Sequence, residues 1–286
     1  MTSVTDPLAA LSTLPGVEEA VSSVRRAVDR VYGHRVMRRR SNEVSAEAAL
    51  RGARASAALS GADWALEEVR RRSDFSGAGE PRTVGGALRV NAEAGQLLSI
   101  WRQSPMRVLA RLHVMASGGA GAESALAAAA GDPGDGVGRP RLAGESVTEP
   151  GAALPEPLPD ADETAARLDA LAALVVAGSS APALVMAAVV HGELLTLRPF
   201  HTGNGLVARA AERIVLVGSG LDPKAVCPAE VGHAEQGRGA YETALAGYAS
   251  GTPEGVGGWI AHCGRAVELG ARESTAVCEA LQRGAA

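Results

Sequence analysis

The chain has little lysine and few aromatic side chains. Lys224 is the only lysine among 28 basic residues, and aromatic residues make up 3% of the 286 positions. The core must therefore be built mainly from alanine, valine and leucine. The net charge of −4 gives no general reason to expect a nucleic acid or a membrane surface as a partner. A composition rich in alanine, glycine and arginine is typical of proteins from high-GC bacteria.

Cysteine is also scarce. Cys227, Cys263 and Cys278 are widely spaced and odd in number, so they form neither a disulfide framework nor a metal-ligand pattern. We expect Cys263 and Cys278 to be buried thiols on a C-terminal helix. Unpaired thiols fit a reducing compartment, which predicts a cytoplasmic protein.

No long hydrophobic run is continuous. Residues 170–190 form the longest uncharged stretch, but residues 178–182 divide it into two shorter pieces. This pattern predicts two buried helices joined by a tight turn rather than a membrane span. The opening residues, MTSVTDPLAALSTLPG, have neither a basic start nor a sustained apolar core, so no secretory signal is expected.

Helical periodicity accounts for most of the remaining chain, whereas a regular alternation of strands and helices is missing. The sequence therefore predicts a mainly α fold. We expect helices over residues 16–40, 45–73 with a break near Gly61, 90–117 despite Pro105, 162–177, 181–197, 205–217 and most of the C-terminal third.

The first 40 residues form a basic helical segment, which we expect to be distinct from a main domain of residues 41–286. Valines recur at helical spacing, so one face should be buried: Val21, Val24, Val28 and Val31. Arginines 38–40 would lie at the negative end of the helix dipole. A nucleic-acid patch is the alternative, but acidic residues are interspersed with the basic ones.

Residues 118–160 are rich in glycine, alanine and proline, so they cannot be mostly regular structure. We expect a loop in the middle of this segment and a short β-hairpin around residues 141–147.

Residues 198–209, RPFHTGNGLVAR, carry the clearest chemical signal. Gly203, Asn204 and Gly205 can adopt backbone angles closed to bulkier residues, and an apolar helix follows directly. The unpaired N–H groups at the start of that helix are expected to bind an anion such as a phosphate. Arg209, one turn later, would add a charged fork of donors. The alternative is an ordinary turn with Arg209 on the surface.

Residues 203–208 also fit the loose dinucleotide fingerprint G-x-G-x-x-G/A. A nicotinamide-binding domain needs a buried strand directly before the glycines and alternating strands and helices around them. The sequence predicts neither, which argues against a nicotinamide oxidoreductase.

The same segment resembles the signature of the Fic (Fido-domain) family, His-x-Phe-x-Asp/Glu-Gly-Asn-Gly-Arg-x-x-Arg. The helix before this signature, with His191 seven residues upstream, is similar to the family helix, and residues 240–271 resemble its closing helices. Residues 138–160 resemble the flap that clamps a target peptide. The resemblance covers about residues 41–280 and implies a Fic/Doc-like helical bundle with a short β-hairpin flap.

The resemblance implies transfer of AMP, or a related nucleoside phosphate, from a nucleotide such as ATP to a hydroxyl group of a target protein. In the family the histidine is the general base, the acidic residue holds Mg²⁺, and the Gly-Asn-Gly backbone forms the anion hole. Two arginines contact the outer phosphates. This chain keeps Phe200, Gly203, Asn204, Gly205 and Arg209.

Three functional positions of the signature are replaced. Arg198 stands in place of the histidine and, being permanently protonated, cannot accept a proton from a hydroxyl. Thr202 replaces the acidic residue and Leu206 the first arginine, so we expect no Mg²⁺ held by a protein carboxylate. His201 as a displaced base is an alternative, although a packing or surface role is favoured. These changes argue against ordinary transfer.

Many Fic proteins carry an inhibitory motif, Ser/Thr-x-x-x-Glu-Gly/Asn, whose glutamate pairs with the last arginine of the signature. Residues 56–61 match this frame, with Ser56 and Gly61 at its ends and Ser60 in place of the glutamate. We therefore expect Arg209 to lack its usual partner and to be free for an anion. His191 is expected to bond the backbone and fix the signature loop.

The sequence leaves three functions open. The first is a pseudoenzyme that binds a nucleotide or phosphate at residues 203–205, with Arg209 and Arg198 adding charge, and that holds an unidentified partner protein with its flap. The second is an active transferase with altered chemistry, and the third is a structural remnant. Neither nucleic acid nor a membrane is expected as a partner.

Overall fold

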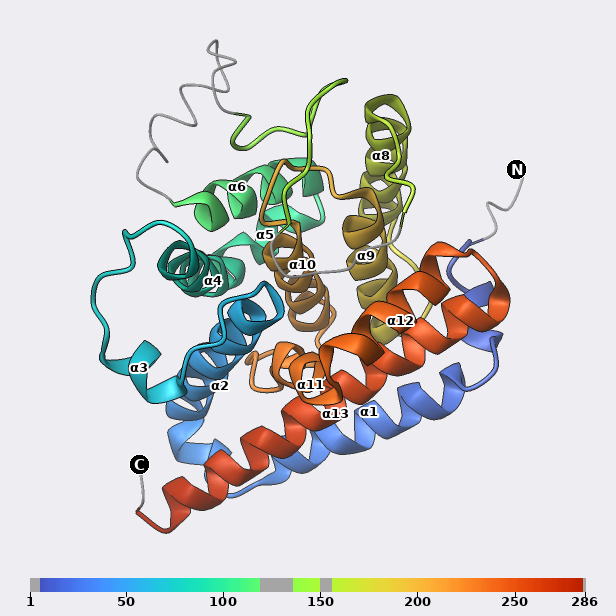
Figure 1. Ribbon diagram of the computed structural model, residues 1–286. Coiled ribbons are helices and arrows are strands. Elements are labelled where there is room, and N and C mark those ends of the chain that lie inside the picture. Colours follow the sequence, from blue (N-terminus) through green and yellow to red (C-terminus); the bar gives the residue numbers. More distant parts are fainter. Residues whose placement is uncertain (1–5, 119–135, 150–155, 285–286) are drawn as a thin grey trace.

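The computed structural model describes residues 6–118, 136–149 and 156–284 (Figure 1). Its α-helices are α1 (Val17–Gly33), α2 (Met37–Leu59), α3 (Leu66–Arg71), α4 (Glu80–Ala94), α5 (Leu98–Trp101), α6 (Pro105–Ser117), α8 (Ala161–Ala177), α9 (Ala183–Leu197), α10 (Asn204–Gly218), α11 (Ala229–Gln236), α12 (Arg238–Ala249) and α13 (Pro253–Gln282). Two 3-10 helices are η1 (Ala10–Thr13) and η2 (Gly95–Leu97). The expected mainly α fold is confirmed. Among the described helices, none has the length and apolar character needed to traverse a lipid bilayer.

Helices α9 and α10 form the centre of the molecule. α9 is apolar on nearly all of its faces, so neighbouring helices must cover it on every side. α10 packs against α9 and also against α2, α4 and α6 (Figure 1). The loop that joins α9 to α10 is therefore held between two buried helices.

The long helix α13 runs beside α1 along one side of the molecule (Figure 1). Val24, Val28 and Val31 of α1 are buried in this contact, as their spacing predicted, whereas Val21 is only half-buried. The expected boundary after residue 40 falls inside α2, at Arg40, whose backbone angles are not helical (φ −124°, ψ 25°).

The basic segment of residues 16–40 is not one helix, contrary to the prediction. α1 ends at Gly33, His34 has an extended backbone, and α2 begins at Met37. The His34 ring accepts a hydrogen bond from the N–H of Val36, which satisfies that donor at the break. Arg38 and Arg39 therefore lie in the first turn of α2, before the kink at Arg40, and not at the end of one helix that begins near residue 16.

Residues 90–117 are also divided. α4 ends at Ala94, and α6 begins at Pro105. Proline suits the first position of a helix because its missing N–H would have no intrahelical acceptor there. Pro105 therefore begins a helix and does not lie within one.

The flap has no strand in the parts that the structure describes, residues 138–149 and 156–160, so the expected β-hairpin was wrong. A turn at Gly144 (φ 84°) leaves only a few residues on either side. These residues pair instead with residues 198–203, the loop between α9 and α10, which we call the signature loop. The N–H of Arg141 donates to the Pro199 carbonyl and that of Thr148 to the His201 carbonyl, both at 2.7 Å.

Candidate functional site

The signature loop begins where α9 ends. Proline disfavours the helical conformation of the residue before it. Arg198, directly before Pro199, accordingly ends α9 with a left-handed backbone (φ 44°). Phe200 is buried and stacks on His113 of α6, with 4.1 Å between ring centroids. The Asn204 side chain fixes the loop, because its Oδ1 accepts from the Phe200 N–H at 2.9 Å and its Nδ2 donates to the Phe200 carbonyl at 2.8 Å.

The start of α10 holds a carboxylate of the same chain. The backbone N–H groups of Asn204 and Gly205, and the side-chain amide of Asn204, donate to Glu149 of the flap at 3.0 to 3.1 Å. Gly203 turns the chain into the helix with a φ of 72°. These donors, together with the positive end of the helix dipole, form a site for a pair of negatively charged oxygens.

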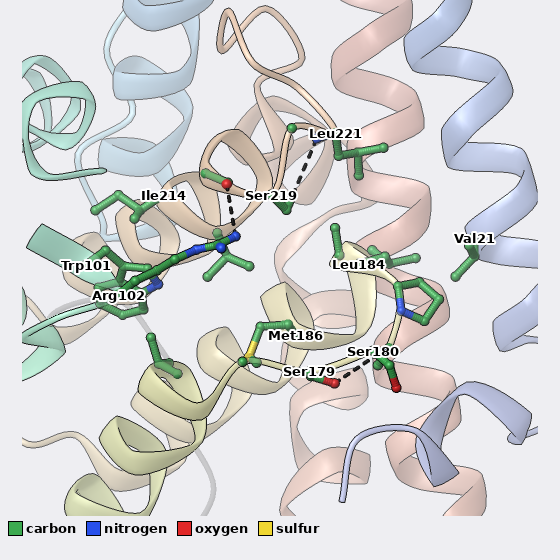
Figure 2. Close-up of a pocket in the computed structure, with 18 of the residues that line it drawn as sticks. Val21, Trp101, Arg102, Ser179, Ser180, Leu184, Met186, Ile214, Ser219 and Leu221 are labelled. Atoms are coloured by element: carbon green, nitrogen blue, oxygen red, sulfur yellow. Dashed lines mark hydrogen bonds between the residues drawn. The ribbon is translucent and has the colours of Figure 1, made fainter. Parts of the chain in front are cut away.

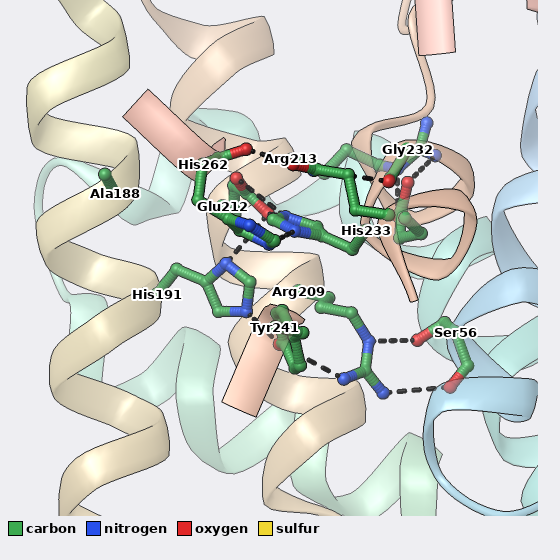
Figure 3. Close-up of polar contacts among 12 residues, drawn as sticks. Ser56, Ala188, His191, Arg209, Glu212, Arg213, Gly232, His233, Tyr241 and His262 are labelled. Atoms are coloured by element: carbon green, nitrogen blue, oxygen red, sulfur yellow. Dashed lines mark hydrogen bonds and ion pairs between the residues drawn. The ribbon is translucent and has the colours of Figure 1, made fainter. Parts of the chain in front are cut away.

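Arg209 is engaged by neutral partners. It is 2% exposed, its Nε donates to Ser56 Oγ at 2.8 Å, and one terminal nitrogen donates to the Ser56 carbonyl at 2.9 Å (Figure 3). The same terminal nitrogen also donates to Ser60 Oγ at 2.7 Å. The expectation that Arg209 is free for an anion was therefore wrong. Residues 56–61 do lie opposite this arginine, with serine hydroxyls in place of a glutamate.

The replaced positions have packing and pairing roles. Arg198 is buried, and one of its terminal nitrogens donates to Glu156 at 3.1 Å. Thr202 is half-buried in the turn before Gly203, and Leu206 belongs to the hydrophobic core. His201 lies edge-on to His113 of α6, with 5.3 Å between ring centroids.

A buried polar network lies beside Arg209 (Figure 3). His191 Nε2 is 2.7 Å from the Tyr241 hydroxyl, and His191 Nδ1 is 3.0 Å from a Glu212 oxygen. His233 Nε2 is hydrogen-bonded to the same oxygen at 3.0 Å, and its Nδ1 lies 3.3 Å from His262 Nε2. The network thus connects the helices that hold the signature loop to α11, α12 and α13.

Sequence reasoning missed this network. His191 was expected to bond the backbone, but its ring faces Tyr241 and Glu212. One signal was present: α10 carries Arg209, Glu212 and Arg213 within an otherwise apolar helix. Charged residues in a helix that must be buried need partners in the core.

Burial and neighbouring charges set the ionisation of the network. Burial lowers the pKa of His191, although the Glu212 carboxylate opposes this effect. Burial alone would raise the pKa of Glu212, but His191 and His233 outweigh it and hold that pKa below its ordinary value. Burial and the neighbouring histidines lower the pKa of His262 to about 3. The two histidines thus lower the pKa of Glu212 although its side chain is fully buried.

A groove of about 820 Å³ lies at the other ends of α9 and α10 (Figure 2). It is lined by Leu184 and Met186 near the start of α9 and by Ser219 and Leu221 after the end of α10. Because α10 has 15 residues, this groove is roughly 20 Å from the signature loop. It does not contribute to the anion site.

Solved structures of Fic proteins are among those that resemble this one. A Fic family protein from Desulfovibrio desulfuricans matches with a TM-score of 0.69 and 20% sequence identity, over 92% of this chain and 75% of that one. A fragment of Fic-1 from C. elegans matches with a TM-score of 0.62 and 16% identity, over 92% of this chain and 72% of that one. No family model and no curated protein sequence matches this chain. The chain therefore adopts the fold of Fic family proteins.

Proposed function

We propose that this Fic-fold protein binds the phosphate of a nucleotide, or another phosphate group, without carrying out the transfer typical of the family. One observation carries the proposal: three N–H donors of Asn204 and Gly205 converge on the Glu149 carboxylate. A phosphate presents a similar pair of negatively charged oxygens and can replace the carboxylate on these donors.

The replaced signature positions favour binding over transfer. Arg198 cannot accept a proton, and a general base contributes about 10²- to 10⁴-fold to such reactions. Thr202 is a weak, neutral ligand for Mg²⁺, and Leu206 brings no charge to a phosphate. Binding of ATP is therefore expected to depend little on Mg²⁺.

Arg209 supports the proposal through its charge. Its partners Ser56 and Ser60 are neutral, so they do not cancel the guanidinium charge. The guanidinium also lies against Gly205, because a Cβ built at that glycine would be 3.1 Å from both terminal nitrogens. A positive charge this close to the helix start, in a buried region, adds to the attraction for an anion.

The flap is the proposed contact for a partner protein. Arg141 and Thr148 bind its backbone to the signature loop, and Leu142 between them is 56% exposed. An exposed leucine on a segment joined to the anion site offers a partner an apolar contact there.

We place phosphate binding and partner binding in a bacterial cytoplasm, where the three buried free thiols stay reduced.

The direct test is calorimetric titration of the full chain with ATP, with and without Mg²⁺, beside the variant Gly205→Glu. We expect the wild type to bind and the variant to lose binding. Residue 205 has a helical backbone that accepts a side chain, and the new carboxylate would compete for the N–H donors beside Arg209. Equal binding by both proteins would place the ligand elsewhere.

Glu149→Gln is expected to bind ATP about 10-fold more tightly than the wild type. Glutamine keeps the size of the side chain but removes its charge, so its hydrogen bonds to Asn204 and Gly205 weaken and the flap is easier to displace. Asp162→Asn is the matched control, because it removes one negative charge at an exposed position in the first turn of α8. An equal gain in the control would assign the effect to net charge.

An active transferase is the second candidate, supported by the intact anion hole and the flap. Transfer of label from ATP to a protein hydroxyl, lost in Gly205→Glu, would establish it, whereas binding without transfer supports a pseudoenzyme. If neither ATP nor inorganic phosphate binds the wild type or Glu149→Gln, the phosphate proposal is wrong. The fold would then be a structural remnant or a protein-binding scaffold.

A further inference from the structure

A cluster of metal-binding side chains lies in the core, apart from the anion site. We propose that His191, Glu212, His233 and Cys263 form a structural zinc site. Two imidazole nitrogens, a carboxylate oxygen and a sulfur, one atom from each residue, lie within 4.8 Å of one another. The four residues are fully buried and come from four helices, α9, α10, α11 and α13.

The contacts within the cluster indicate atoms that face a common point. His191 Nδ1 and His233 Nε2 each lie 3.0 Å from the same Glu212 oxygen, so both ring nitrogens face one carboxylate. The Cys263 Sγ lies within 4.8 Å of these atoms, so four potential ligand atoms surround one small volume. Zinc bonds of about 2.0 to 2.3 Å in a tetrahedron place neighbouring ligand atoms roughly 3 to 4 Å apart. An ion among these four atoms therefore requires only small side-chain shifts.

The donor set and its charge select zinc. Imidazole and thiolate ligands favour zinc, whereas Mg²⁺ prefers oxygen ligands. A divalent ion would balance the Cys263 thiolate and the Glu212 carboxylate, and the two histidines would bind as neutral rings. The site would then carry no net charge, which matters in a core where an unbalanced charge is costly.

The outer nitrogens of both histidines have partners that orient the rings. His191 Nε2 lies 2.7 Å from the Tyr241 hydroxyl, and His233 Nδ1 lies 3.3 Å from His262 Nε2 (Figure 3). Metal-binding histidines normally coordinate through one nitrogen and are held by a hydrogen bond at the other. The inner nitrogens are thus already directed toward Glu212.

A surface groove lies beside the cluster, on the side of His262. His262, whose ring contacts His233, lines a groove of about 620 Å³ bordered by residues of α12 and α13. Four protein ligands fill a tetrahedral zinc site and leave no position for a substrate, which makes the site structural. It would fasten α9 and α10, the helices on either side of the signature loop, to α11 and α13.

The test uses the purified full chain, stripped with a chelator and then loaded with zinc or cobalt. We expect about one zinc ion per chain by mass spectrometry and a higher Tm in zinc than in chelator, because zinc binds the folded state. The cobalt form should show an absorption band from sulfur-to-cobalt charge transfer, which reports a thiolate ligand.

Cys263→Ser is expected to abolish the cobalt band and the zinc-dependent rise in Tm. Cys278→Ser is the matched control, since Cys278 is equally buried on the same helix but lies outside the cluster, and it should keep both signals. Circular dichroism checks that each variant is folded. A folded wild type that retains no stoichiometric zinc and shows no cobalt band would overturn the proposal. Retention of the band in Cys263→Ser would also overturn it.

Discussion

Replacing Glu230 by glutamine is expected to lower the free energy of unfolding by about 3 kcal/mol or more. Arg213 of α10 donates to both carboxylate oxygens of Glu230 on α11, from Nε at 2.9 Å and from a terminal nitrogen at 2.8 Å. The two side chains are 9% and 3% exposed. Glutamine would leave the arginine charge buried without its counterion, and α2 leaves little room for water, since a Cβ at Gly52 would be 2.5 Å from Arg213.

Glu43→Gln is the matched control for that prediction. Glu43 also accepts two hydrogen bonds from one guanidinium, that of Arg40, but the side chains of this pair are 50% and 37% exposed. Solvent screens the exposed pair, so the control should unfold at nearly the same denaturant concentration as the wild type. Urea denaturation with a common m-value measures both changes. Equal effects would show that water reaches the Arg213 pair.

Gly232→Ala is expected to lower the free energy of unfolding by about 3 kcal/mol. A Cβ at this position would lie 1.9 Å from the carbonyl oxygen of Ala266. That atom belongs to the backbone of α13, so no side chain can rotate away, and α11 and α13 would have to separate. The same displacement would move His233, the next residue, out of the buried network.

Gly258→Ala, on α13, is the control and is expected to stabilise the protein. Position 258 is exposed within the helix, and nothing lies within 4 Å of its added Cβ. Alanine should therefore stabilise the protein by about 0.5 to 1 kcal/mol through its higher helix propensity. Thermal unfolding of both variants measures the contrast. A neutral Gly232→Ala would mean that α11 and α13 are less closely packed than described.

The sequence predicted the strongly apolar helices correctly but missed two breaks between helices in less apolar segments. α9 and α10 were recognisable because their apolar residues end at clear turn residues. The breaks at His34 and before Pro105 were missed because helical periodicity continues across them, and proline begins helices as well as ending them. The prediction of a hairpin was wrong for another reason. A turn residue such as Gly144 indicates where the chain reverses, but it does not show which segment the residues on either side will pair with.

In the site, features made by neighbouring residues could be predicted from the sequence, whereas contacts between distant residues could not. The donors at Asn204 and Gly205 follow from a few adjacent residues, because a helix start exposes its N–H groups wherever it occurs. Glu149 is 55 positions away from Asn204, and Tyr241 is 50 positions away from His191. Such contacts depend on how the helices pack, and a single sequence without a repeated spacing carries no signal for them.

Because Glu149 and a bound phosphate would compete for the same donors, occupancy of the site and attachment of the flap are thermodynamically linked. If ATP binds as proposed, the factor by which it would weaken flap attachment must equal the factor by which flap release would strengthen ATP binding. A partner that captures the released flap would therefore raise the affinity for ATP without touching it. Under the proposed function, the position of the flap would therefore depend on nucleotide concentration, and the affinity for nucleotide would depend on the concentration of the partner.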